Sequence, residues 1–354
     1  MTHEFKEIIT SYKTALEKGI PAVMATVVDV DGSSYRRPGV GMLLLQNGKI
    51  TGAVSGGCVE KEVWRQAQSV FSTGQSRIMI YDGKYRLGCE GTLFILIEPF
   101  SIDKNKVLTI QNYLKLRIPF TISSWYTKND TSKSIGMGSK VTFESNEDIV
   151  FSNKVTGDQD ISLLCFSRRV HPCFRLIIVG VEHDAIQLSA LASITGWEVI
   201  IVGSSKNGLN HNDFPGALQV LCTSPEEMDV EGIDGQTAVV LMNHNFAKDL
   251  LYLRALKDTT PAYIGLLGPA KRREKLLSAF IEYFPEVSDH FLDLIHGPAG
   301  LNIGAETPQE IAISIIAEIL AVTREQNPIS LQEKKGAIHD QSKQKEVRII
   351  SDSH

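Results

Sequence analysis

Two kinds of hydrophobic spacing follow one another along the chain, and the first kind predicts short strands. Apolar and β-branched runs alternate with turn residues in the first hundred positions, a pattern typical of strands. Strands are expected over residues 22–30, 41–45, 49–54, 76–81 and 92–98. Helical spacing predicts one helix over 3–18 and another that follows Cys58 and extends to Phe71. Residues 1–100 are therefore expected to form a mixed, strand-rich N-terminal domain.

A different rhythm begins at His171-Pro172, where short apolar strands alternate with helices. Strands are expected over 175–179, 198–202, 237–242 and 262–266, with helices over 184–195 and 246–256. The last helix starts at Thr307-Pro308-Gln309-Glu310, which combines a capping box with proline at the first helical position. Strands separated by helices of this length predict βαβ units and a parallel sheet. The expected fold class is α/β, with the mixed domain followed by a Rossmann-like domain over 172–325.

The segments outside these two domains carry less information. Residues 101–171 form a connecting, strand-rich region with an expected helix over 107–117, and the sequence assigns no role to it. Beyond Gln326 the chain becomes polar and mixed in charge, so residues 326–354 are expected to be a flexible tail.

Composition narrows the class of protein. The 354 residues are 43% hydrophobic and 22% charged, which is ordinary for a globular protein. A net charge of −5 and the absence of a basic stripe argue against a general nucleic-acid binder. No signal peptide or membrane-spanning apolar run is expected, and the five scattered cysteines do not resemble a disulfide framework. A cytoplasmic protein with reduced thiols is therefore expected.

The most informative stretch is Ser55-Gly56-Gly57-Cys58-Val59-Glu60, which follows an apolar run and opens a helix. Paired glycines permit close approach of a ligand, and a helix N-terminus favours the thiolate form of Cys58. A second thiol, Cys89, lies in a similar glycine setting. Two such thiols predict a site for a soft metal or a sulfur-bearing cofactor, with Cys58 and Cys89 as metal ligands. The alternative is that each is a structural cysteine packed as a small hydrophobe.

Two arginine-containing loops are candidate anion sites. Arg37 belongs to the run Gly32–Gly39, which offers hydroxyls, guanidinium groups and glycine turns. Lys271, Arg272 and Arg273 begin a predicted helix directly after Gly268-Pro269-Ala270, where N–H groups and the helix dipole favour an anion. The alternative for both is a solvated surface loop.

Binding of a conventional dinucleotide is not expected from the Rossmann-like half. Glu182 replaces the second glycine of the Gly-x-Gly pattern and would repel a pyrophosphate. Gly203 stands after the second strand, where an acidic residue would accept the ribose. His244, after a later strand, is a candidate ligand or base, or simply a structural residue.

Taken together, these motifs resemble the XdhC/CoxI family of accessory factors of xanthine dehydrogenase and related molybdenum hydroxylases. The resemblance covers about residues 15–100 and 172–325, and its most specific run extends from Gly297 to Ala312. It implies binding of the molybdenum cofactor (molybdopterin), assistance in its sulfuration, and its insertion into a xanthine dehydrogenase-type hydroxylase. The implied cofactor-binding residues are Arg37, Ser55, Gly56, Gly57, Cys58, Glu60, Cys89, Lys271, Arg272 and Arg273.

Several points stay open at the level of sequence. A non-catalytic cofactor chaperone is the leading hypothesis, with an NAD(P)-dependent oxidoreductase and a scaffold with a degenerate site as alternatives. A cysteine desulfurase and a second copy of the chain stay open as further partners. The family's usual Gly-Ala-Gly is Gly180-Val181-Glu182 here, and its usual His-Asp pair is His244-Asn245, which weakens nucleotide binding in that half.

Overall fold

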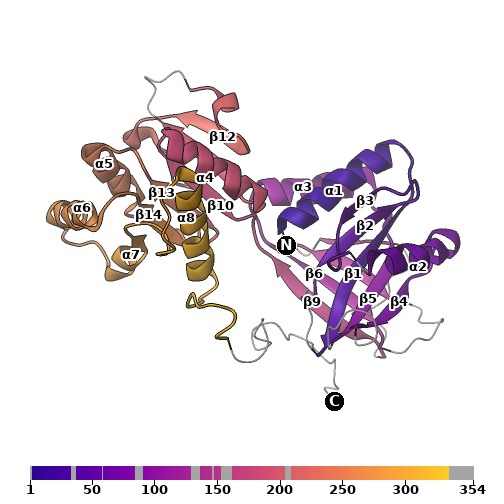
Figure 1. Ribbon diagram of the computed structural model, residues 1–354. Helices are drawn as coiled ribbons and strands as arrows, with labels where there is room; N and C mark the ends of the chain where they lie inside the picture. Colours follow the sequence, from indigo (N-terminus) through magenta and orange to yellow (C-terminus); the bar gives the residue numbers. More distant parts are fainter. Residues whose placement is uncertain are drawn as a thin grey trace, which may run out of the picture. The chain divides into compact units, whose positions relative to one another are not determined.

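The computed structural model describes residues 2–32, 37–57, 59–83, 91–128, 136–145, 147–152, 162–203 and 209–334. The chain divides after Pro172 into two compact units (Figure 1). Cys58, Cys89 and residues 335–354 of the predicted tail lie outside the described residues. No helix within the described ranges is long and apolar enough to cross a membrane.

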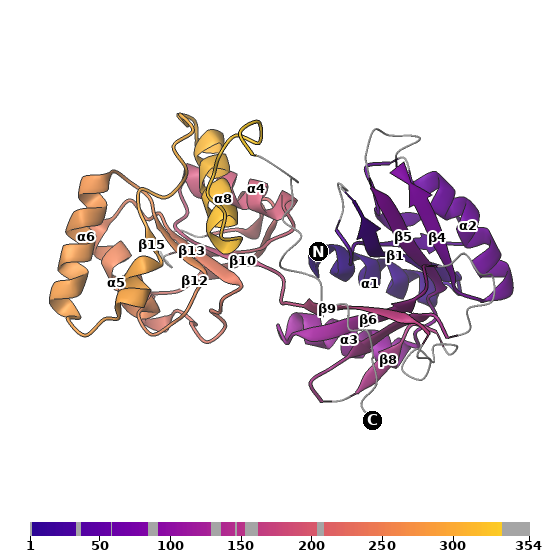
Figure 2. The same cartoon turned by 90° about the horizontal axis from the view of Figure 1, so that it is seen from below.

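The N-terminal unit is built on a five-stranded antiparallel sheet with the order β3-β2-β1-β5-β4. Its strands are β1 (Ala22–Asp31), β2 (Gly41–Leu45), β3 (Ile50–Gly52), β4 (Arg77–Asp82) and β5 (Thr92–Pro99). Helices α1 (Thr2–Glu17) and α2 (Glu60–Thr73) cover opposite faces of this sheet (Figure 2). The alternation of side chains along β1 explains this, since Val23 and Ala25 pack with α2 whereas Met24 packs with α1.

A second, four-stranded antiparallel sheet completes this unit, with the order β8-β7-β6-β9. Its strands are β6 (Phe120–Tyr126), β7 (Gly138–Thr142), β8 (Asp148–Val150) and β9 (Leu164–Val170), and helix α3 (Lys104–Lys115) precedes them. Apolar residues of this sheet and of α3 share one core with α1, which includes Phe5, Ile110 and Phe120. The four strands therefore belong to the same compact unit as the first hundred residues.

The C-terminal unit contains a six-stranded parallel sheet with the order β12-β11-β10-β13-β14-β15. Its strands are β10 (Arg175–Val179), β11 (Glu198–Gly203), β12 (Ala217–Cys222), β13 (Thr237–Leu241), β14 (Tyr263–Leu266) and β15 (Ile295–His296). The strand order reverses between β10 and β13, which creates the switch point typical of doubly wound sheets.

Helices cover both faces of this parallel sheet (Figure 1). Helices α4 (His183–Ile194) and α8 (Pro308–Thr323) pack on one face. Helices α5 (Phe246–Leu256), α6 (Ala270–Tyr283) and α7 (Asp289–Asp293) pack on the other. The predicted fold class is confirmed: antiparallel sheets in the N-terminal unit and a Rossmann-type parallel sheet in the C-terminal one. The capping box of Thr307 and Glu310 is present as predicted.

Sequence analysis did not identify three strands, β8, β12 and β15. Strands β8 and β15 have only three and two residues, too few to show a period. Strand β12 lies at the edge of its sheet and exposes most of its residues, so apolar burial does not mark it.

Candidate functional site

The turn that leads into α2 is held together by Ser55 and Glu60. The Ser55 backbone N–H donates to Glu60 Oε1 at 2.8 Å, and the Ser55 hydroxyl donates to Glu60 Oε2 at 2.6 Å. The same hydroxyl oxygen accepts from the N–H groups of Gly57 at 3.1 Å and Val59 at 3.2 Å. Three backbone N–H groups of the turn are therefore satisfied by the protein itself, and the helix start carries its own carboxylate.

The ionisation of Glu60 agrees with this arrangement. Burial opposes the charged form, but hydrogen bonds from the Ser55 side chain and from backbone N–H groups outweigh it. The pKa of Glu60 is consequently held below its ordinary value. Val59, the N-cap residue of α2, contributes no side-chain cap, and the carboxylates of Glu60 and Glu62 both lie in the first turn of the helix, where negative charge is favourable.

The outer side of the turn is open. Gly56 and Gly57 are exposed, and a Cβ atom built on either residue would meet no atom within 4 Å. Gly57 has a φ of +117°, which side-chain-bearing residues rarely adopt. A ligand can therefore approach the backbone immediately before Cys58, whose own position lies outside the described residues. Both thiols predicted as metal ligands, Cys58 and Cys89, lie outside the described residues, and within the described ranges no group of three or more His, Cys, Asp or Glu side chains could hold a metal ion.

The predicted Arg37 loop is described only at its two ends. At its start, Asp29 and Asp31 both pair with Lys128 Nζ, at 2.8 and 3.1 Å. At its end, Gly39 has a φ of +94° and donates its N–H to Val27 O at 2.7 Å. Arg37 is exposed, and within the described ranges its guanidinium has no hydrogen-bond or ion-pair partner. Residues 33–36 lie outside the described part of the chain.

The basic start of α6 divides into residues with different environments. Arg272 donates from Nη2 to Asp249 Oδ2 at 2.7 Å, and the Asp249 side chain is only 4% exposed. The other oxygen of Asp249 accepts from Asn243 Nδ2 at 3.0 Å. The Arg272 guanidinium is therefore engaged with a buried carboxylate of α5, although sequence analysis predicted it as a cofactor ligand.

The two neighbours of Arg272 are free of such a bond. Lys271 is exposed. Arg273 is half-buried, and its Nε has no hydrogen-bond partner. Its Cδ lies 3.0 Å from the position that a Cβ on Gly297 would take, so a side chain at position 297 would displace Arg273 slightly. Among the described residues, Arg272 is therefore the one of the three predicted basic residues that forms an ion pair.

The switch point of the parallel sheet holds the pair His244 and Asp184. Glu182 is exposed at the N-cap of α4, and Gly180 approaches Met242 so closely that a Cβ would lie 2.6 Å from its carbonyl oxygen. His244 has a φ of +52°, and its Nε2 lies 3.8 Å from Asp184 Oδ2. The position that a dinucleotide phosphate would occupy is thus bordered by acidic side chains.

The long run from Gly297 to Ala312 has a structural explanation. Glu318 Oε2 accepts from the Tyr263 hydroxyl at 2.5 Å and from the Gly300 N–H at 2.7 Å. The Ser314 hydroxyl donates to Leu301 O at 2.5 Å. These bonds fasten the loop to α8 and to the end of the sheet, so this specific run stabilises the Rossmann-type unit.

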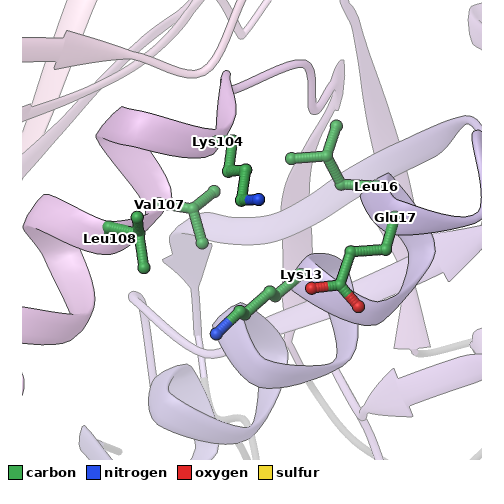
Figure 3. A pocket seen from close by; sticks show the side chains of 6 residues that line it. All are labelled: Lys13, Leu16, Glu17, Lys104, Val107 and Leu108. Atoms are coloured by element: carbon green, nitrogen blue, oxygen red, sulfur yellow. The ribbon is translucent and has the colours of Figure 1, made fainter.

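A separate pocket of about 290 Å³ lies between α1 and α3 (Figure 3). It is lined by Lys13, Leu16, Glu17, Lys104, Val107 and Leu108. None of the residues predicted as ligands lines it.

Sequence analysis missed Asp249 and the buried carboxyl group of Glu98. Glu98 accepts from the N–H of Ser139 at 2.7 Å and from its hydroxyl at 2.5 Å. Burial raises the pKa of Glu98 to about 7, although these hydrogen bonds act in the opposite direction. The available signal was a glutamate within the otherwise apolar strand β5.

Comparison with known proteins gives matches over both units. The model of the XdhC and CoxI family matches residues 15–82, and that of the XdhC Rossmann domain matches residues 176–319. A Bacillus subtilis (strain 168) protein, named as a probable subunit of xanthine dehydrogenase, is 30% identical over 332 residues, covering 88% of this chain and 96% of the relative. The Escherichia coli (strain K12) "Molybdenum cofactor insertion chaperone PaoD" is 26% identical, covering 91% of this chain and 90% of the relative.

A solved structure shares the same architecture. The crystal structure of a protein described as a xanthine dehydrogenase from Bacillus halodurans matches with a TM-score of 0.74 and 26% identity, covering 92% of this chain and 98% of that one. The fold and the turn before α2 define a two-unit protein with an XdhC-type Rossmann domain. The chain belongs to the XdhC/CoxI family, as the sequence motifs predicted.

Proposed function

We propose that this protein is an accessory factor that binds molybdenum cofactor, assists its sulfuration, and inserts it into a xanthine dehydrogenase-type molybdenum hydroxylase. The observation that carries the proposal is the open turn Ser55–Gly57, which Glu60 holds immediately before Cys58 at the start of α2. An accessible backbone beside a thiol suits a cargo with a metal and sulfur centre.

The relatives support this role. One is named as a molybdenum cofactor insertion chaperone and another as a probable subunit of xanthine dehydrogenase, and each is matched over at least 90% of its length. A carrier needs to hold its cargo and release it, which reversible thiolate and arginine contacts allow. No turnover by this chain itself is required.

Each predicted ligand has a distinct role in the proposal. Cys58 and Cys89 supply soft donors to the metal or to the transferred sulfur. Arg37 supplies a cation for the phosphate within the N-terminal unit, and Lys271 and Arg273 supply cations for an anion within the C-terminal unit. Arg272 acts indirectly, because its ion pair with Asp249 fixes the start of α6. Ser55, Gly56, Gly57 and Glu60 shape the turn that bears Cys58.

The partner in the proposal is a molybdenum hydroxylase that receives the cofactor. A cysteine desulfurase, a homodimer and a cytoplasmic location stay predictions from the sequence. The absence of useful NAD(P) affinity also stays a prediction, supported by the exposed Glu182 at the N-terminus of α4.

Cofactor retention tests the proposal directly. The full chain and its Cys58→Ser variant are purified from a host that produces molybdenum cofactor, and molybdenum and the oxidised pterin are quantified in each. Cys222→Ser is the matched control, because Cys222 is an exposed thiol of the C-terminal unit. We expect Cys58→Ser to lose most of the cofactor and Cys222→Ser to retain it. Equal retention in all three proteins would refute a role for Cys58.

Titration with NADH and NADPH separates the oxidoreductase alternative. A dissociation constant in the low micromolar range, about −8 kcal/mol of binding free energy, would favour that alternative. We expect no saturable binding in this range.

A further inference from the structure

Arg168 of strand β9 is a partly buried arginine that forms no ion pair with any described residue. Its guanidinium lies over the ring of Phe5, with Cζ 5.8 Å from the ring centroid. Among the described residues it makes no hydrogen bond and no ion pair. Its neighbour Arg169 is exposed and donates to Glu144 Oε1 at 3.0 Å. Two adjacent arginines on one strand therefore differ in that only the more buried one lacks an acceptor.

The Arg168 guanidinium is partly open to solvent and lacks a protein acceptor among the described residues. A guanidinium withdrawn from water is ordinarily compensated by a carboxylate or by several hydrogen bonds. Arg272 and Arg175 in the C-terminal unit follow this rule, through Asp249 and Glu198. Burial lowers the pKa of Arg168 to about 10, and the charge of Glu4 opposes this only in part. The Arg168 cation therefore has unused capacity to bind an anion.

The position of Arg168 links it to the Arg37 loop. The loop ends at Gly39, and a Cβ on Gly39 would lie 2.7 Å from Arg168 Cδ and 3.4 Å from Phe166 Cζ. The backbone of the loop thus rests directly on the Arg168 side chain. A side chain at position 39 would displace Arg168 and would be strained by the φ of +94°, which favours glycine there. Arg37, two residues earlier, is exposed and also lacks a partner among the described residues.

We propose that Arg168, together with Arg37, forms a phosphate-binding subsite of the N-terminal unit at the end of the Gly32–Gly39 loop. The planar fork of Arg168 would donate to two phosphate oxygens, and Phe5 and Gly39 hold the side chain in place. The identity of the phosphate rests on the proposed function: it is the phosphate of the pterin cofactor, bound by the same unit that carries Cys58.

The test uses the full chain and inorganic phosphate as the probe. Hydrogen–deuterium exchange is followed by mass spectrometry in peptides covering residues 37–45 and 164–172, with phosphate or with chloride at equal ionic strength. The variants are Arg168→Gln and the matched control Arg169→Gln, which removes the same charge one residue away. Cofactor retention from a cofactor-producing host is measured for the same proteins.

Phosphate is expected to slow exchange in both peptides of wild type and Arg169→Gln, and to leave Arg168→Gln unchanged. Cofactor affinity is expected to fall about tenfold or more in Arg168→Gln, which is the ordinary effect of losing a charged hydrogen bond. Without phosphate, Arg168→Gln should be no less stable than Arg169→Gln, because it removes an uncompensated cation. If it is less stable, Arg168→Lys, which retains the charge without the fork, is expected to keep part of the phosphate protection.

The remaining outcomes are distinguishable. Equal phosphate protection in all variants would overturn the subsite and leave Arg168 as a packing residue against Phe5. Loss of phosphate protection with unchanged cofactor retention would keep the anion subsite and assign it to another phosphate ligand. If Cys58→Ser loses the cofactor but phosphate still slows exchange in both of its peptides, the Arg168 subsite stands. Failure of the Arg168 subsite can therefore be distinguished from failure of the proposed function.

Discussion

Replacing Arg272 by alanine should destabilise the C-terminal unit, because the change leaves Asp249 as a buried, unpaired carboxylate. The Arg272 side chain is 26% exposed and that of Asp249 is 4% exposed, so water cannot fully replace the lost partner. Breaking a buried ion pair from one side costs about 3–5 kcal/mol, and a single hydrogen bond to a charged group contributes about 1.5–3 kcal/mol. Since Arg272 is partly exposed and Asn243 still donates to Asp249, we expect a loss of about 2–3 kcal/mol.

The assay is urea unfolding of the full chain, followed by circular dichroism. With a slope of about 2 kcal/mol per molar of urea, the expected loss lowers the midpoint of the C-terminal unit's transition by about 1–1.5 M. Lys271→Ala is the matched control, because Lys271 is the adjacent exposed cation of the same helix, and it should leave the midpoint unchanged. The double variant Arg272→Ala/Asp249→Asn should recover part of the loss, since a neutral amide replaces the stranded charge.

Two results would contradict this reasoning. Arg272→Ala as stable as wild type would mean that the carboxylate of Asp249 finds another partner or water. A loss of stability in Lys271→Ala as large as in Arg272→Ala would mean that the charge of the helix start matters, and not the ion pair. If Arg272→Ala is destabilised, a fall in its cofactor retention cannot be taken as evidence of direct contact with the phosphate.

Three further predictions concern the N-terminal unit. The native pKa of Glu98, about 7, lies above its ordinary value of 4.5, so the unfolded state binds fewer protons than the native state between these pH values, and the free energy of unfolding should fall as pH rises from about 4.5 to 7. In thermal melts recorded across that range, Glu98→Gln should flatten this dependence on pH. An unchanged dependence would exclude Glu98 as its source. Gly57→Ala should lower the free energy of unfolding by about 1 kcal/mol, because the φ of Gly57 is strained for a residue with a side chain. Gly56→Ala should lower it less, since a Cβ there also meets open space but the φ of Gly56 is not positive. Equal midpoints of the two variants in urea unfolding would contradict this prediction. Ser55→Ala removes the acceptor of two N–H groups in the turn before α2. Hydrogen exchange in a peptide covering residues 53–63 should therefore be faster than in wild type. Unchanged exchange would show that the turn does not depend on this hydroxyl.

Much of the fold follows from local pattern. The strand that became β1 and the helix that became α5 were predicted within about one residue at either end, because side-chain period and turn residues report backbone conformation directly. The capping box of α8 was identified from four residues for the same reason. Edge strand β12 was missed because its residues are largely exposed and leave no hydrophobic period.

The candidate site was predictable only in part. The glycine turn before Cys58 was recognised from its residue types, but the use of Glu60 by the turn itself was not. From the sequence alone, a carboxylate five residues after a hydroxyl could point either toward a ligand or back into its own turn. Arg272 shows the same ambiguity, since a basic helix start looks alike whether its arginine meets a phosphate or Asp249.

The sequence by itself determined the main strands and helices of both units, the motifs before Cys58 and between Gly297 and Ala312, and the membership of the XdhC/CoxI family, because these depend on residues close together along the chain. Only the tertiary structure decided which charged groups meet: Arg272 with Asp249 of another helix, Glu98 with Ser139 of a second sheet, and Arg168 with the backbone of Gly39. Hydrophobic period specifies which face of an element is buried, whereas the pairing of polar groups depends on how separate elements pack, and no local spacing encodes that.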